Sequence, residues 1–138
     1  MSLPTSIRWY RDLQVWQVAL DLVADTYRLV AAFPKHETYG LARQARDAAV
    51  SIPANIAEGH GREHLGDYLH HLSVANGSLM ELETHCLIAE RLEYVTHQEA
   101  RRVLDRAADV GRMLAGLTRS LKRVRERRCN PQHLTPDT

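Results

Sequence analysis

The chain has 138 residues, which is enough for one domain with a buried core. Apolar residues make up 44% of it and charged residues 25%, and the formal net charge is +1 at pH 7. This balance is typical of a globular domain and excludes a general attraction of the whole chain to nucleic acid or membranes. No uncharged apolar run approaches the roughly 18 residues of a membrane span, and residues 1–12 lack the apolar core of a signal peptide. We therefore expect a cytoplasmic protein without a membrane partner.

The first predicted helix covers residues 12–33. Asp12 is expected to cap its start, and Pro34 is expected to stop it because proline has no amide hydrogen. Apolar residues that recur every three or four positions predict its buried stripe: Leu13, Trp16, Leu20, Val23, Tyr27 and Val30. Other apolar residues lie off the stripes and indicate a surface for self-association, with a thick core as the alternative. They are Val15, Val18, Leu22 and Leu29 here, and Leu69, Leu87 and Ile88 in the third predicted helix.

The second predicted helix covers residues 38–59. Pro53 should kink it, because proline removes one backbone hydrogen bond, and Gly59 is expected directly after its last turn. The spacing of its apolar residues predicts an inner stripe of small and branched side chains: Leu41, Ala45, Ala48, Ile52 and Ile56.

The third predicted helix covers residues 64–92. Gly77 lies inside it, at a cost of about 1 kcal/mol relative to alanine. Close packing against the small residues Ala48, Ala49 and Ser51 is the compensation that we expect. The predicted stripe of this helix comprises Leu65, Tyr68, Leu72, Ala75, Leu79, Leu82, Cys86 and Ala89.

The fourth predicted helix covers residues 97–127 and begins at a capping box formed by Thr96 and Glu99. Its stripe comprises Ala100, Val103, Ala107, Val110, Leu114, Leu117, Leu121 and Val124. Residues 129–138 lack periodicity and predict a flexible tail after a single domain of residues 1–128. Four helices with short links predict an all-α, antiparallel up-down-up-down four-helix bundle.

Several segments carry a family resemblance: Gly40-Leu41, Gln44, Ser51-Ile52-Pro53-Ala54-Asn55-Ile56-Ala57-Glu58-Gly59 and residues 77–84. In these segments, and over about residues 10–125, the chain resembles the bacterial 23S rRNA intervening-sequence proteins, also called S23-like proteins. The resemblance implies a four-helix bundle that assembles as a homopentamer and has no enzymatic activity.

This family is similar to the accessory proteins of diversity-generating retroelements, which are pentameric barrels that bind nucleic acid and a reverse transcriptase. The resemblance therefore implies a nucleic acid and a protein as partners, besides further copies of the chain. Two positions depart from the family pattern. Asp47 stands where a basic residue is common, which weakens the analogy of a basic face on the second helix, and His64 stands where a serine cap is common.

Polar residues of the second and third helices are expected at neighbouring levels of the bundle: Ser51, Asn55, Glu58, Ser78 and Glu81. Buried polar groups need hydrogen-bond partners, so we interpret these five as a structural cluster that holds the helix register and the turn. The alternative interpretation is a polar site for a ligand.

The end of the fourth helix is basic, with six cations and one acid, Glu126, and a formal charge of about +5. The cations are Arg119, Lys122, Arg123, Arg125, Arg127 and Arg128. They suggest a site for RNA or DNA phosphates, and a ring of five such ends would favour polyanions. The alternative is a solvated helix end that complements the helix dipole. Earlier in this helix, the spacing predicts surface ion pairs of Arg101 with Asp105 and of Arg106 with Asp109.

Metal binding and catalysis find little support. The sequence contains no Glu-x-x-His pair. Glu81 with His85, and His60 with His64, have a chelating spacing, but such pairs are common by chance. No phosphate-binding loop or nucleophile elbow is present, and Cys86 lies on a buried stripe. We predict no metal, no cofactor and no enzymatic activity. The hypothesis is an oligomeric binding or scaffold protein for RNA or DNA, and the alternative is a purely protein-interaction or structural oligomer.

Overall fold

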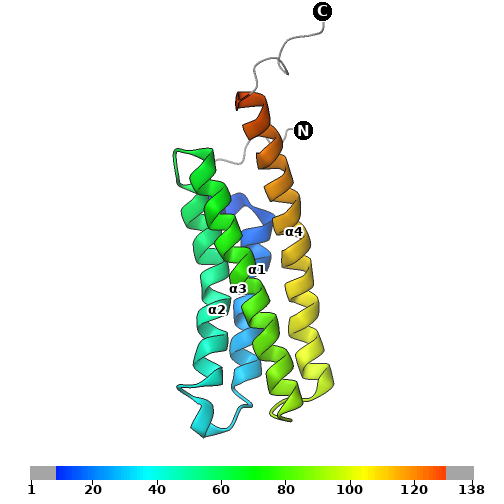
Figure 1. Cartoon of the computed structure of the whole chain (residues 1–138). Helices are drawn as coiled ribbons and strands as arrows, with labels where there is room; N and C mark the ends of the chain where they lie inside the picture. Colours follow the sequence, from blue (N-terminus) through cyan, green and yellow to red (C-terminus); the bar gives the residue numbers. More distant parts are fainter. Residues whose placement is uncertain (1–8, 130–138) are drawn as a thin grey trace, which may run out of the picture.

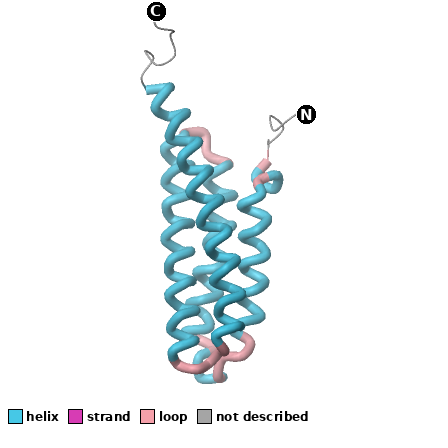
Figure 2. The backbone as a smooth tube through the Cα atoms, turned by 90° about the vertical axis from the view of Figure 1, so that its right-hand side faces the viewer, coloured by secondary structure: helices cyan, strands magenta, loops and turns pink. Residues whose placement is uncertain are grey.

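The computed structural model describes residues 9–129, and every regular element in this part of the chain is helical. The elements are η2 (Tyr10–Asp12), α1 (Gln14–Val30), η3 (Lys35–Glu37), α2 (Leu41–His60), α3 (Leu65–Arg91) and α4 (His97–Cys129). The four α-helices lie side by side along their length, with the α1–α2 and α3–α4 links at one end and the α2–α3 link at the other (Figures 1 and 2). The prediction of an all-α protein with four helices is confirmed.

The helix ends differ from the predicted ones by a few residues. Asp12 belongs to η2, and Leu13 takes the N-cap position of α1 without a side-chain hydrogen bond, so the prediction of an Asp12 cap is wrong. The helix α1 ends at Val30, before Pro34 is reached. At the other end of the chain, α4 continues to Cys129 and so includes the first residue of the predicted tail. Residues 130–138 lie outside the described part.

The core face of α1 agrees with the predicted stripe only in part. The buried residues Val15, Ala19, Leu22, Thr26 and Leu29 form one helical face, whereas the predicted Leu20 and Tyr27 are 42% and 48% exposed. Of the other predicted residues, Leu13 and Val30 are buried, and Trp16 and Val23 are half-buried. Both stripes have steps of three and four residues, so periodicity does not distinguish them. Most residues assigned to a self-association surface on α1 therefore belong to the core instead.

The inner stripes predicted for the other helices are largely confirmed. Among the residues of the predicted α2 stripe, only Leu41 is half-buried and the others are buried. Among those of the predicted α3 stripe, only Leu65 and Tyr68 are half-buried. In α4 the predicted stripe is buried as far as Leu114, and the later positions are only partly covered. The reason is visible in Figure 1, where α4 extends beyond the ends of the other helices. Leu117 and Leu121 still pack against the core at one side, whereas the final turn has no neighbouring helix.

A buried carboxylate joins α1 to α4. Asp25 has a side chain only 3% exposed and accepts a hydrogen bond of 3.0 Å from Nε of Arg106. Asp21 lies 3.7 Å from the same guanidinium. The predicted pairing of Arg106 with Asp109 is therefore wrong, and Asp109 pairs with Arg112 instead.

Two further expectations concern local features of α3 and α4. The capping box is confirmed, because the Thr96 amide donates to Glu99 Oε1 at 2.8 Å and the Glu99 amide donates to Thr96 Oγ1 at 3.1 Å. The expected close packing at Gly77 is wrong, because a Cβ atom built there would meet nothing within 4 Å. Among residues 9–129, none of the helices has the length and apolar composition needed to cross a membrane.

Candidate nucleic-acid interface and polar cluster

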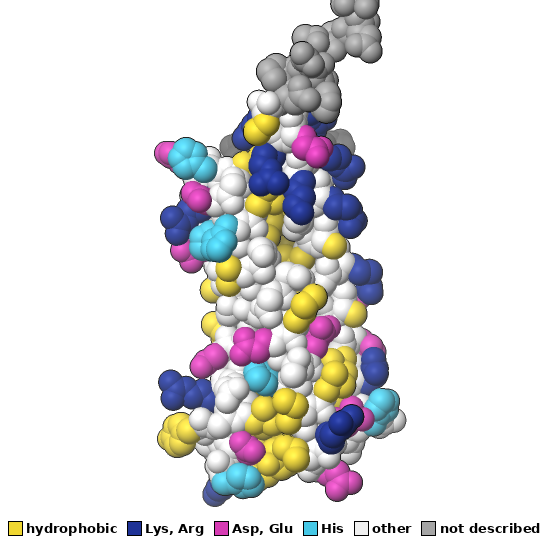
Figure 3. All heavy atoms as spheres, in the orientation of Figure 1, with side chains coloured by type: hydrophobic (Ala, Val, Ile, Leu, Met, Phe, Trp, Pro, Cys, Tyr) yellow, Lys and Arg dark blue, Asp and Glu magenta, His cyan; other side chains and the backbone are white. Residues whose placement is uncertain are grey.

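The candidate nucleic-acid interface is the C-terminal part of α4, whose last turn extends past the bundle. All six cations predicted there are exposed: Arg119, Lys122, Arg123, Arg125, Arg127 and Arg128. The ion pairs of α4 within the described residues lie earlier in the helix, at Arg101, Arg106 and Arg112. The charge of this end is therefore not neutralised by acids of the bundle. Figure 3 shows Lys and Arg side chains gathered over the upper part of α4.

Helix geometry directs most of this charge to one side. Successive residues of an α-helix turn by about 100°, so Arg119, Lys122, Arg123 and Arg127 project from one broad face of α4. The opposite face carries Leu117, Leu121 and Val124, which are partly buried. The sequence thus keeps an apolar stripe toward the bundle while the cations face solvent.

The polar cluster predicted on α2 and α3 forms in part. The Ser51 and Ser78 hydroxyls lie 2.9 Å apart and connect the two helices. The Asn55 amide donates to the Ser51 carbonyl oxygen at 2.9 Å and to the Ser51 hydroxyl at 3.0 Å. Glu58 lies one turn further along α2, with its carboxylate 3.7 Å from Nε2 of His71. The structure thus brings together Ser51, Asn55, Glu58 and Ser78.

Glu81 does not join these residues. Its carboxylate lies 3.4 Å from Nε2 of His85, one turn later in α3. The contacts of Ser78 with Ser51 and of His71 with Asn55 show that later residues of α3 lie beside earlier residues of α2. Glu81 therefore lies away from Asn55 and Glu58, and its side chain is 55% exposed. The prediction that Glu81 belongs to the cluster is therefore wrong.

Two residues of the cluster were missed in the sequence. His71 Nδ1 lies 3.0 Å from Asn55 Oδ1, and Arg62 donates to Glu58 Oε2 at 2.7 Å. The spacing of four residues between Glu58 and Arg62 could have indicated their pair. Nothing local connects His71 with Asn55, because their contact depends on how α2 and α3 are aligned.

The geometry of the cluster favours the structural interpretation. Both ends of the Asn55 amide, and both serine hydroxyls, have partners inside the protein. Neither serine of the cluster is paired with a base, because the hydroxyls of Ser51 and Ser78 contact each other and an amide. A satisfied network of this kind aligns two helices and leaves few polar atoms for a ligand.

Packing also affects two further titratable groups of the bundle, Tyr68 and Cys86. His60 Nδ1 lies 3.2 Å from the Tyr68 hydroxyl, and burial raises the pKa of Tyr68 to about 12. Burial, with a smaller contribution from Glu83, raises the pKa of the Cys86 thiol to about 12, so this thiol is a poor nucleophile. Within residues 9–129, no three metal-ligating side chains gather at one place.

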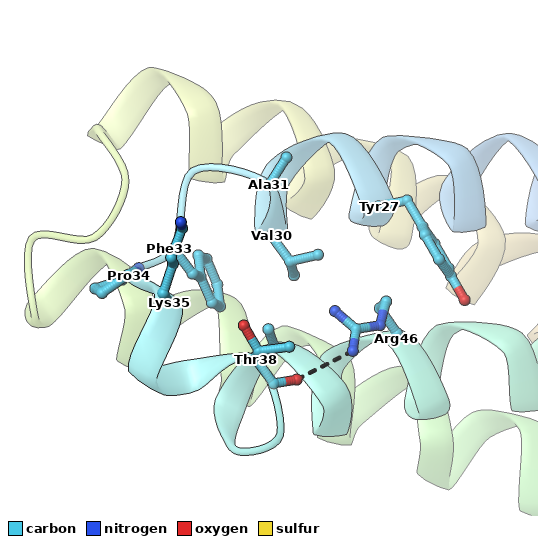
Figure 4. Close-up of a pocket in the computed structure, with 9 residues that line it drawn as sticks. Tyr27, Val30, Ala31, Phe33, Pro34, Lys35, Thr38 and Arg46 are labelled. Atoms are coloured by element: carbon cyan, nitrogen blue, oxygen red, sulfur yellow. Dashed lines mark hydrogen bonds between the residues drawn. The ribbon is translucent and has the colours of Figure 1, made fainter.

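A hollow of about 400 Å³ lies at the α1–α2 link. Figure 4 shows its lining, with Arg46 directed toward Thr38 and the Tyr27 ring on the other side. The Arg46 guanidinium donates to the Thr38 carbonyl oxygen at 3.1 Å and lies 6.0 Å from the centre of the Tyr27 ring. These contacts hold the link against α2, so the arginine already has a structural role here.

Comparisons with known proteins agree with this architecture. Residues 11–116 match the family model described as 23S rRNA-intervening sequence protein. A protein of unknown function from the S23 ribosomal protein family of Bacteroides thetaiotaomicron has a similar structure, with a TM-score of 0.68 and 19% sequence identity. The alignment covers 75% of this chain and 97% of that chain, and at this identity it shows the fold alone. No match was found among curated proteins.

Proposed function

The chain belongs to the 23S rRNA-intervening sequence protein family, and from this premise we propose that it is a non-enzymatic binding protein for RNA or DNA phosphates. The proposed contact surface is the exposed basic end of α4. The single observation that carries the proposal is the combination found there: six exposed cations on a helix that extends beyond the bundle, without neutralising acids among the described residues of the bundle. Phosphate backbones bind such surfaces mainly through release of counterions, without a need for a particular base sequence.

We further propose that copies of the chain assemble as a homopentamer of antiparallel up-down-up-down bundles. Apolar side chains on the outside of α3 support such self-association, because single bundles seldom expose so many large ones. Exposed fractions are 58% for Met80, 52% for Leu87 and 41% for Ile88. Five basic helix ends in one particle would carry about 25 positive charges and would raise the affinity for a polyanion through multivalency. Sedimentation of a particle of five 15.7 kDa chains would support this assembly, and a monodisperse single chain would contradict it.

Charge reversal tests the nucleic-acid proposal. The double variant Arg123→Glu/Arg125→Glu should lose most of the affinity for labelled RNA and DNA, and wild-type affinity should fall steeply with added salt. The matched control is Arg101→Glu/Arg102→Glu, which makes the same change of net charge at exposed positions near the other end of α4. Equal loss in both variants would mean that only net charge matters, and unchanged binding in the first variant would refute the assignment of the surface.

The alternative function is a protein-interaction or structural oligomer without a nucleic-acid role, with a protein as the partner. The exposed apolar side chains of α3 favour it, because they would serve such a partner as well as a second copy of the chain. The two functions separate at about 50 mM salt, where a phosphate-binding protein should bind RNA or DNA measurably. Absence of binding under this condition, together with a stable oligomer, would favour the alternative.

A further inference from the structure

A groove lies between α3 and α4, next to the basic end of α4. Its volume is about 380 Å³. Leu69, Leu72 and Leu114 line it, and all three are at most 8% exposed, so they form an apolar floor. In Figure 3 apolar surface is visible between the two helices in the upper half of the molecule, beside Lys and Arg side chains.

The groove exists because the side chains along its rims are short. On the α3 side the rim consists of Ser73 and Asn76, and on the α4 side it includes Ala115 and Thr118. Their spacing of three residues on each helix places them in two facing rows. Longer apolar side chains at these positions would cover the leucine floor, as they do along most helix contacts.

The rim provides hydrogen-bonding groups and positive charge. Within the described residues, the side chains of Ser73, Asn76 and Thr118 make no hydrogen bond to the protein, so their polar atoms are available. Arg119 and Lys122 also line the groove, and both belong to the six cations of the basic α4 end. An apolar floor, polar rims and two adjacent cations thus occur within one small hollow.

We propose that this groove holds an unpaired base of single-stranded RNA or DNA, while Arg119 and Lys122 contact the phosphates next to it. This inference rests on the proposed function and specifies its substrate as single-stranded rather than duplex nucleic acid. A base in a duplex is covered by its stacked neighbours, whereas an unpaired base can place its apolar face on leucine side chains and its edge against Ser, Asn or Thr. The guanidinium of Arg119 can also stack on the base plane.

The charge at the rim argues for a nucleic acid rather than a second copy of the chain. The centres of protein–protein interfaces are depleted of lysine, and they bury few unpaired charges. Here two cations border the floor directly, and four more follow along the same helix. This arrangement complements a chain of phosphates.

The test measures binding of the full-length chain to labelled single strands and to duplexes of the same sequence. Wild type should bind the single strand about tenfold more tightly than the duplex. Ala115→Trp fills the groove from an exposed position and keeps every cation, so this preference should disappear while duplex affinity stays unchanged. The matched control is Ala108→Trp, an exposed alanine of α4 outside the groove, which should keep the preference.

A second variant, Ser73→Trp, fills the groove from α3 and should reproduce the result if Ala115→Trp fails to fold. A 2-aminopurine base in the single strand gives an independent signal, because its fluorescence should change on binding to wild type but not to either filled variant. If wild type binds neither nucleic acid, the proposed function fails and this inference fails with it. Equal affinity for both, or a preference that survives filling, overturns the groove assignment alone. A changed oligomer size in the filled variants would assign the groove to contacts between copies and would also overturn the inference.

Discussion

At the scale of single residues, Asn55 shows how a side chain can hold two helices in register. Its amide nitrogen binds the preceding turn of α2 at Ser51, and its oxygen faces His71 of α3. Ser51 in turn contacts Ser78, so the two helices are connected at two successive levels. Burial of an amide costs little free energy when its nitrogen and its oxygen both keep hydrogen-bond partners. When the amide is removed, those partners lose their hydrogen bonds.

Replacement of this amide should destabilise the bundle. We expect Asn55→Ala to lower the free energy of unfolding by about 1–3 kcal/mol, because Ser51 and His71 lose their partner in a partly dry environment. Urea unfolding followed by circular dichroism measures the change. The control is Asn76→Ala, since Asn76 is exposed and makes no side-chain hydrogen bond within residues 9–129. Equal stability of both variants would contradict a structural role of the cluster.

Glu37 connects the start of α2 with the α3–α4 link. Its Oε1 accepts a hydrogen bond of 2.9 Å from the Leu41 amide, and its Oε2 accepts one of 2.8 Å from the Tyr94 hydroxyl. The backbone hydrogen bond first and the Tyr94 hydroxyl second lower the pKa of Glu37 below its ordinary value of 4.5, and the same contact raises the pKa of Tyr94. These hydrogen bonds thus stabilise the ionised carboxylate of Glu37 in the folded state.

This lowered pKa predicts a pH dependence of stability. The folded state holds the Glu37 proton less tightly than the unfolded state, so the contribution is complete above pH 4.5 and is lost as the pH falls through the lower folded value. Between about pH 6 and pH 3, the melting temperature of wild type should fall more than that of Glu37→Gln. Glu63→Gln, at an exposed position, should fall as wild type does. Parallel curves for wild type and Glu37→Gln would contradict the assignment.

At the scale of elements, two helical glycines have opposite surroundings. A Cβ atom at Gly59 would lie 2.8 Å from the His71 Cβ and 3.3 Å from the Tyr68 carbonyl oxygen, so α2 and α3 approach each other closely there. The helix α2 continues to His60, so Gly59 lies inside it, and Gly61, with φ of −81°, is the C-cap residue. The prediction that Gly59 follows the last turn is therefore wrong. Gly77 faces open space on the outside of α3.

These surroundings predict stability changes of opposite sign. Gly59→Ala should lower the free energy of unfolding by about 1–3 kcal/mol, because the atoms that the new methyl group meets include backbone and cannot simply rotate away. Gly77→Ala should raise it by up to about 1 kcal/mol, because alanine favours the helix and meets nothing. Each variant is the control for the other in the same urea titration. A stabilising Gly59→Ala would show that the helices separate there at no cost.

At the scale of the whole molecule, Asp25 and Arg106 connect the first helix to the last. The carboxylate is almost completely buried, and the exposed Arg28 is its second cationic partner, at 3.3 Å. A buried charge of this kind depends on its partners, and removal of Arg106 leaves Asp25 with only the exposed Arg28. The contact lies between residues 81 positions apart in the chain.

Loss of the Arg106 guanidinium should be costly. Arg106→Met keeps the apolar part of the side chain but removes the charge, and it should lower the free energy of unfolding by about 3 kcal/mol. The double variant Asp25→Asn/Arg106→Met should lose less than the sum of the two single variants, because the charge that needs a partner is gone. Arg101→Met removes an exposed pair with Asp105 and should cost at most about 1 kcal/mol. Additive effects at Asp25 and Arg106 would contradict their coupling.

Much of the fold and part of the candidate site could be predicted from the sequence. The four helices, the Thr96–Glu99 capping box and the exposed basic end of α4 depend on residues within a turn or two of one another, so spacing and residue type are sufficient. The contact of Ser51 with Ser78 could be predicted because both residues lie near the middle of their helices. Glu81 was placed wrongly because later residues of α3 lie beside earlier residues of α2, so Glu81 lies away from Asn55 and Glu58.

The sequence by itself determined where helices form, which of their residues can be buried and where positive charge accumulates, because these properties follow from local periodicity and composition. The tertiary structure alone decided which of two equally spaced stripes of α1 faces the core, that Arg106 binds Asp25, that His71 joins Asn55, and that short side chains leave a groove over Leu69 and Leu114. These outcomes depend on the rotation and alignment of whole helices against each other. That arrangement minimises the free energy of all contacts together, so no short segment of the chain specifies it.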